Sequence, residues 1–180
     1  DAPLSAPRGG GAGGGGTGDQ QEVDFILLIP DEFIGAVLGK GGATIKRLQW
    51  QTHTTIRCSP PNAVHPGTSS RLVTLSSASA AALDAAQSLI LLTVAQEHST
   101  AFCEVGVLLD EGVVGRVIGR GGERIARLRE GCERAEVTPS DGSGQRMLIV
   151  SGDVAQITRA VRKVIDLSMG IMDDWPHLGS

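Results

Sequence analysis

Apolar residues run along the chain in two similar series of blocks. Each series opens with a short, continuously apolar block, which is typical of a strand covered on both faces. Apolar positions three and four residues apart then predict two helices joined by a glycine-rich loop, followed by two short strands and a last helix. The predicted order in each series is β-α-α-β-β-α. These elements are expected at residues 22–29, 31–38, 43–52, 54–58, 71–76 and 79–96, and again at 102–109, 110–118, 123–132, 134–138, 146–151 and 153–172.

The two series are copies of one sequence. Residues 34–48 and 114–128 are identical at eight of fifteen positions when aligned at an offset of 80. Self-similarity of this kind predicts two copies of one structural unit. Gly, Ala and Pro dominate the first 20 residues, which predicts a disordered leader. The predicted organisation is a leader at 1–21, a first domain at 22–98, a second at 99–172 and a tail at 173–180, with about five residues, 97–101, joining the domains.

Each copy carries a glycine loop with one cation, Gly-Lys-Gly-Gly at 39–42 and Gly-Arg-Gly-Gly at 119–122. Glycines permit turns that side chains forbid and let a ligand approach the backbone. Amides at the start of the following helix favour a phosphate. The spacing excludes a nucleotide P-loop, and the preceding helix argues against a dinucleotide fingerprint. We therefore expect two phosphate-gripping loops.

The segment Ile-Gly-x-x-x-Gly-Lys-Gly-Gly-x-x-Ile at 34–45 resembles the signature of the KH (K-homology) domain. The GXXG loop of that family clamps four nucleotides of single-stranded nucleic acid. Residues 66–75 of the first copy also resemble the variable loop and third strand of Nova-type KH domains. The resemblance covers residues 22–172 and implies an α+β fold of two type I KH domains. Each would pack a three-stranded antiparallel sheet on three helices.

The resemblance also implies a set of nucleic-acid contacts. Lys40 and Arg120 would hold phosphates, and branched aliphatic residues would form the floor beneath the bases. Arg134 stands where cytosine-preferring KH domains have an arginine, with an ion pair to Glu130 as its alternative role. In the first copy Arg57 comes two residues later than that position. The candidate RNA-binding residues are Ile34, Gly39, Lys40, Gly41, Gly42, Ile45, Ile56, Arg57, Val114, Gly119, Arg120, Gly121, Gly122, Ile125 and Arg134.

Charge and composition narrow the function further. The net charge of −4 argues against a broad basic surface but allows a few local phosphate contacts. Three cysteines without ligand spacing predict no metal and no cofactor, and no Ser/His/Asp arrangement predicts an enzyme. No apolar run reaches the ~18 residues that would span a membrane. We expect an intracellular protein of the nucleus or cytoplasm, and further KH domains or protein partners beyond this chain.

The predicted function is sequence-selective binding of single-stranded RNA, with single-stranded DNA as a second option, in the regulation of RNA processing, translation or stability. Two alternatives stay open. One is a protein–protein scaffold whose KH grooves no longer bind nucleic acid, and the other is an accessory module of an RNA enzyme.

The short linker and surplus apolar surface also predict how the domains pack. Residues 89–92 are apolar around the whole helix, which indicates burial on more than one side. The first strands of both copies are equally apolar. We expect packing through the first strands and last helices, in a pseudo-twofold arrangement with the glycine loops facing outward. A charge at Leu91 or Leu92 should then destabilise both halves.

Overall fold

The computed structural model describes residues 21–98 and 104–171. Both copies have the predicted β-α-α-β-β-α order, with a short 3₁₀ turn at each glycine loop. The predicted tail, nearly all of the predicted leader and most of the linker lie outside the described residues. The first copy comprises β1 (Val23–Pro30), α1 (Asp31–Leu38), η1 (Lys40–Gly42), α2 (Ala43–Thr52), β2 (Thr55–Cys58), β3 (Ser70–Ser77) and α3 (Ala80–Glu97). The second comprises β4 (Glu104–Asp110), α4 (Glu111–Ile118), η2 (Arg120–Gly122), α5 (Glu123–Glu130), β5 (Arg134–Val137), β6 (Gln145–Ser151) and α6 (Val154–Ser168).

The helix boundaries have local causes. The Ser79 hydroxyl accepts the Ala82 amide at the start of α3, and Asp153 forms a capping box with Gln156 at the start of α6. Both of these helices therefore begin where the sequence predicts. Two helices end earlier than predicted, α5 at Glu130 and α6 at Ser168.

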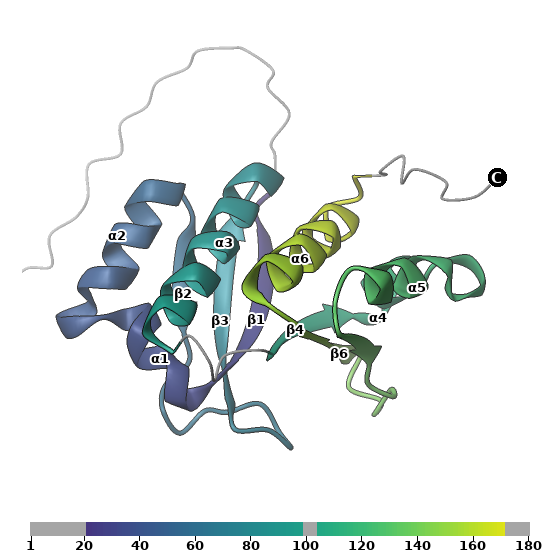
Figure 1. Ribbon diagram of the computed structural model, residues 1–180, viewed down its shortest axis with the longest axis horizontal. Coiled ribbons are helices and arrows are strands. Elements are labelled where there is room, and N and C mark those ends of the chain that lie inside the picture. Colours follow the sequence, from purple (N-terminus) through teal and green to yellow (C-terminus); the bar gives the residue numbers. More distant parts are fainter. Residues whose placement is uncertain (1–20, 99–103, 172–180) are drawn as a thin grey trace, which may run out of the picture.

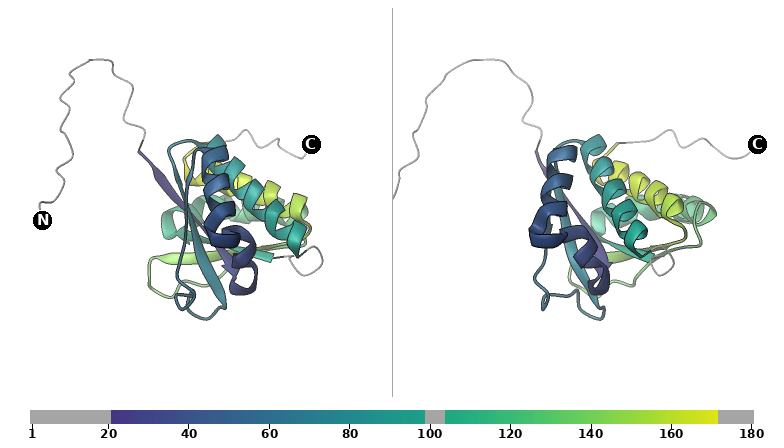
Figure 2. Two further views of the ribbon diagram at one scale, coloured as in Figure 1. Left: turned by 90° about the vertical axis from the view of Figure 1, so that its left-hand side faces the viewer. Right: turned by 60° about the vertical axis from the view of Figure 1, so that its left-hand side comes forward.

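The strands of both copies join in one six-stranded antiparallel sheet, ordered β2-β3-β1-β4-β6-β5. The α-helices cover one face of this sheet (Figures 1 and 2). Alternate strand residues such as Phe25, Leu27 and Ile29 point into the core beneath the helices. That core is a single apolar cluster drawn from both copies. Two units of this size are marginal alone, so a shared core stabilises both.

The two copies meet at their first strands, as predicted. Strands β1 and β4 pair antiparallel through Ile26 with Leu108, Leu27 with Val107, and Leu28 with Gly106. At the repeat offset of 80, Leu27 and Val107 are equivalent positions. A pseudo-twofold axis therefore passes through this central pair.

The last helices complete the contact between the copies. The side-chain amide of Gln87 on α3 is fully buried and donates to the carbonyl oxygen of Thr158 on α6 at 3.1 Å. The Arg162 Nε lies 2.8 Å from the Asp84 carboxylate. Leu91 is fully buried, whereas Leu92 is 46% exposed. The prediction that a charge at Leu92 would act like one at Leu91 is therefore wrong, because Leu92 faces solvent rather than the neighbouring helix.

Candidate nucleic-acid interface

The glycine loops of the two copies have nearly the same backbone. Gly39 has φ 70° and ψ 175°, and Gly119 has φ 74° and ψ 178°. Gly41 and Gly121 have φ of 61° and 62°. In each loop the fourth residue's amide donates to the first residue's carbonyl at 3.2 Å. The repeat in sequence is thus a repeat in geometry.

The glycines of each loop serve different purposes. A Cβ at Gly39 would lie 2.8 Å from the amide nitrogen of Thr44, and one at Gly119 would lie 2.9 Å from the Cγ of Arg124. Side chains are therefore excluded there by the next helix. A Cβ at Gly41 would meet nothing within 4 Å, as would one at Gly121. The backbone there is bare and open to a ligand.

The loop cations are free to act on an approaching ligand. Lys40 and Arg120 are exposed, and neither forms an ion pair with another residue in the described part of the chain. An open loop with one cation and helix amides behind it is suited to a phosphate.

The predicted floor residues are distributed between the core and the surface. Ile34 and Val114 are almost completely enclosed, and Ile56 and Ile125 are buried as well. Ile45 is half-buried and packs against the core from its edge. The four buried side chains can support the floor of a groove without touching a ligand. Ile45 is the residue of these five that has exposed side-chain surface to contact a base.

Arg57 and Arg134 are exposed and lie on the strand face opposite the core. Arg57 is 3.9 Å from the Asp24 carboxylate on β1. Arg134 donates from Nε and Nη2 to Glu136 at 3.0 and 2.7 Å, and its Nη1 lies 3.6 Å from Glu104. The hydrogen bond and charge of Glu136, with a smaller effect of Glu104, raise the Arg134 pKa. The ion-pair partners of Arg134 are therefore Glu136 on the same strand and Glu104 on β4, and not Glu130.

Two arginines that are not among the predicted contact residues occupy equivalent positions in the two copies. Arg71 donates from Nε to the Ser59 carbonyl at 2.9 Å and lies 3.4 Å from Asp31. Arg146 donates from Nε to the Thr138 carbonyl at 2.7 Å and lies 3.7 Å from Glu111.

Each of these arginines ties the strand pair to the start of the first helix, at the end of that helix away from the glycine loop. The sequence could have indicated this contact, because in both copies the third strand carries an arginine and the first helix begins with an acidic residue.

The surroundings of the two loops differ in where charge is placed. A cavity of about 420 Å³ lies behind the first loop, between α1 and α3, and includes Ala36, Lys40 and Thr44. The equivalent positions in the second copy are Arg116, Arg120 and Arg124. The Arg124 Nη1 donates to the Arg116 carbonyl at 3.0 Å, which holds this guanidinium beside the loop. The second loop therefore has more cations at these three positions, although Glu123 makes the net charge of residues 114–128 equal to the +3 of residues 34–48.

The described residues contain no cluster of three metal-ligating side chains. Burial raises the pKa of the Cys58 thiol, and burial likewise raises that of Cys132. Within residues 21–98 and 104–171, no helix is long and apolar enough to cross a membrane.

Residues 24–92 and residues 104–166 each match the family model of the KH domain. The chain belongs to the KH domain family. It is 27% identical over 172 residues to the human RNA-binding protein Nova-2, an alignment that covers 83% of this chain and 35% of that protein. The chain thus spans about a third of the length of this curated relative.

Solved structures are also similar to the chain. The first type I KH domain of human vigilin is 21% identical, with a TM-score of 0.38, and covers 53% of this chain and 96% of that one. Dim2p from Pyrococcus horikoshii OT3 is 21% identical, with a TM-score of 0.29, and covers 84% of this chain and 93% of that one.

Proposed function

We propose that the two KH domains bind single-stranded RNA with sequence selectivity, each through its glycine loop and the adjacent groove. The observation that carries the proposal is the glycine loop itself, built twice with the same backbone and one exposed cation each. Membership of the KH family and similarity to an RNA-binding protein support it. About four nucleotides would lie in each groove.

Within each domain, the glycine loop and the groove would bind different parts of the RNA. Lys40 and Arg120 would pair with phosphates, and the bare glycine backbone would let the RNA approach closely. Selectivity would come from the edge of the second strand and from the groove floor, as in other single-stranded RNA binders. The net charge of −4 limits the electrostatic footprint to these local contacts.

The packing of the domains constrains how RNA reaches both sites. Helix pairs α1–α2 and α4–α5 lie toward opposite ends of the sheet (Figure 1). One RNA would have to pass around the module to fill both grooves, or two segments would bind separately. Avidity then depends on the length of RNA between the two target sequences.

A role in RNA processing, translation or stability, in the nucleus or the cytoplasm, is part of this proposal. So are further KH domains or protein partners beyond the chain, because the relative is about three times as long. Single-stranded DNA would fit the same grooves. We propose no enzymatic activity for this module.

The test disables each loop in turn. The variants Lys40→Asp/Gly41→Asp and Arg120→Asp/Gly121→Asp put negative charge where a phosphate would lie. Aspartate tolerates the left-handed backbone of Gly41 and Gly121 better than most residues do, and the open space around these two positions accommodates it. Affinity for an RNA selected from a random pool should fall by about 1.5–3 kcal/mol per disabled site.

The control for total charge is Ala155→Asp/Arg159→Asp, on the exposed face of α6, which changes the charge by the same three units and should bind RNA like the parent. Circular dichroism should show that all variants are folded. Parent-like RNA binding by both double variants would exclude the clamp.

A further inference from the structure

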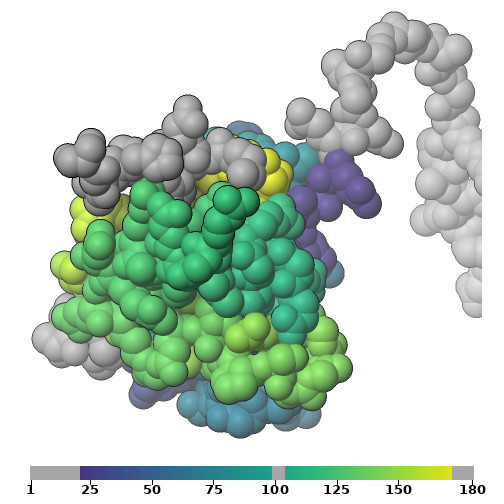
Figure 3. All heavy atoms as spheres, turned by 90° about the vertical axis from the view of Figure 1, so that its right-hand side faces the viewer, coloured from purple at the N-terminus to yellow at the C-terminus, as the bar shows by residue number. Residues whose placement is uncertain are grey.

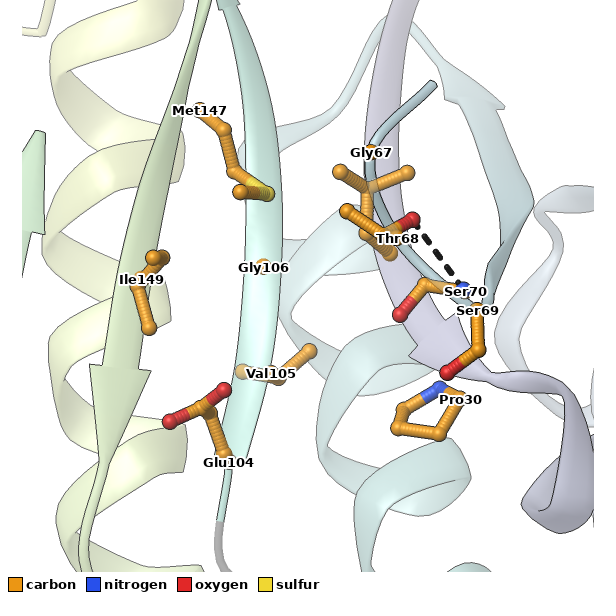
Figure 4. A pocket seen from close by; sticks show the side chains of 11 residues that line it. Pro30, Gly67, Thr68, Ser69, Ser70, Glu104, Val105, Gly106, Met147 and Ile149 are labelled. Carbon is orange, nitrogen blue, oxygen red and sulfur yellow. Dashed lines mark hydrogen bonds between the residues drawn. The ribbon is translucent and has the colours of Figure 1, made fainter. Parts of the chain in front are cut away.

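A pocket lies on the open face of the sheet, away from the helices and at the junction of the two domains (Figure 4). It has a volume of about 440 Å³, within the range of small ligand sites. Its floor comes from β1, β4 and β6, including Leu28, Gly106 and Met147, and its wall is the end of the β2–β3 loop, residues 67–70. The glycine loops take no part in it.

The floor of the pocket differs from the twofold-related surface because the two KH domains differ at equivalent positions. Gly106 stands where the first domain has Ile26, and it pairs directly with Leu28. A Cβ at Gly106 would lie 3.0 Å from the Leu28 Cβ and 3.1 Å from the Met147 Sδ. At the twofold-related place, next to Leu108, the Ile26 side chain occupies this space. At Gly106 the same space is taken by Leu28 and by the Met147 Sδ, which approach the bare β4 backbone closely, so the floor differs between the two sides of the junction.

The second difference is the length of the loop between the last two strands. Residues 59–69 form this loop in the first domain, whereas residues 138–144 form it in the second. In Figure 3 the blue β2–β3 loop lies beside the light green β5–β6 hairpin of the second domain. The longer loop thus reaches over the sheet and encloses one side of the pocket.

Hydrogen bonds hold this loop in shape before any ligand arrives. The Thr68 hydroxyl donates to the His65 carbonyl at 2.8 Å and accepts the Ser70 amide at 3.1 Å. The His65 amide donates to the Ser70 carbonyl at 2.9 Å. A preformed wall lowers the ordering cost of binding.

The chemistry of the pocket selects an occupant with an apolar body and a positive end. The half-buried Met147 and Ile149 offer an aliphatic floor above the enclosed Leu28, and serine and threonine hydroxyls line the rim. The lining includes one carboxylate, Glu104, and no cation. Glu104 shares the Arg134 guanidinium with Glu136, so two carboxylates face one positive charge. The surplus is negative, which repels a phosphate backbone.

We propose that this pocket binds an extended peptide of a partner protein, through a leucine or methionine side chain with a lysine or arginine two residues away. The aliphatic side chain enters between Gly106 and the β2–β3 loop, over Met147. The cation lies against Glu104. A KH module would in this way hold RNA at its two outer grooves and a protein at the junction between them.

The probe is the blocked peptide acetyl-Gly-Leu-Gly-Lys-Gly-amide, titrated into the full chain with methyl groups labelled for NMR. Saturable shifts are expected at the Leu28, Met147 and Ile149 methyls, with a Kd in the millimolar range (~1–10 mM). The same peptide with glutamate in place of lysine should bind about two- to fivefold more weakly, the range of an exposed ion pair. Glu104→Gln should remove that preference.

A matched pair of variants tests the location. Met147→Gln should weaken the lysine peptide about tenfold, because it places a polar group on the floor. Leu72→Gln makes the same kind of change at the equivalent position of β3, outside the pocket, and should leave binding unchanged. The Lys40→Asp/Gly41→Asp variant should also bind the peptide normally, which separates this proposal from the RNA clamp.

Three results would overturn the proposal: no saturable shift up to ~20 mM peptide, equal binding of the acidic peptide, or equal weakening by Leu72→Gln. A further overturning result is displacement of the same methyl resonances by single-stranded RNA, since that would assign the pocket to nucleic acid.

Discussion

Leu27 on β1 pairs with Val107 on β4, and the two are equivalent residues of the repeat. Each is fully buried on the helix side of the sheet. The pseudo-twofold axis between the KH domains therefore passes through the backbone pairing of β1 with β4. The domains are joined by a continuous sheet as well as by side-chain contacts. Such a junction couples the folding of one domain to that of the other.

This coupling predicts a joint response to a charge at the helix interface. Leu91→Asp places a carboxylate at a fully buried position of α3 and should cost at least ~3 kcal/mol. Both domains should melt earlier, in one transition. Leu92→Asp, one residue further on the exposed side, should change stability by less than about 0.5 kcal/mol.

Thermal unfolding followed by NMR signals from each domain is the measurement. A variant in which the second domain keeps its parental melting temperature would contradict the coupling.

The glycine loops predict different effects of substitution at Gly39 and Gly41. Gly39→Ala should destabilise by about 1–3 kcal/mol, because its φ and ψ lie in a region that essentially only glycine adopts, and its Cβ would overlap Thr44. Gly41→Ala should cost less, about 1–2 kcal/mol, since nothing surrounds its Cβ. RNA affinity should instead fall at Gly41→Ala, because the methyl group blocks the approach of a phosphate.

Chemical denaturation measures the loss of stability in the Gly39→Ala and Gly41→Ala variants, and RNA titration measures their loss of affinity. The equivalent pair, Gly119→Ala and Gly121→Ala, provides the internal replicate. Equal stability losses within each pair would show that packing against the next helix does not matter.

The Asp84–Arg162 ion pair should contribute to domain packing. A double-mutant cycle of Asp84→Ala and Arg162→Ala should give a coupling energy of about 0.5–1 kcal/mol at low salt. The two side chains are 24% and 51% exposed, so added salt should reduce it. Asp84→Arg combined with Arg162→Asp should recover stability relative to either single reversal. A coupling of zero at low salt would mean that the apolar contacts and the Gln87–Thr158 hydrogen bond hold α3 to α6 without help from this ion pair.

The role of Arg134 can be separated from its ion pairs. If it reads a base edge, Arg134→Ala should relax discrimination at one nucleotide by ~1–3 kcal/mol and leave other positions unchanged. Glu136→Gln, which removes the principal charged partner, should keep that discrimination. RNA selection with single-nucleotide variants is the measurement. A uniform loss across all sequences would make Arg134 a phosphate-contacting or structural residue.

The sequence by itself determined the repeat, the order of elements and the positions of both glycine loops. These features are local, because helix period, strand alternation and the demand for glycine at positive φ act over a few residues. The apolar excess of residues 25–29 and 89–92 was enough to predict which elements meet. It was not enough to orient them, and Leu92 is on the outside as a result.

Only the tertiary structure decided which side chains share a strand face or a junction. The pairing of Arg134 with Glu104, and the placement of Arg71 beside Asp31, depend on sheet register and on where α1 begins. The close approach of Leu28 and Met147 to the Gly106 backbone arises only when β4 is placed between β1 and β6, which brings a glycine opposite Leu28. Such contacts join residues far apart in the sequence. The local apolar pattern fixes which face of a strand a side chain takes, but the strand that lies beside it, and so the residue opposite, depends on how the whole chain folds.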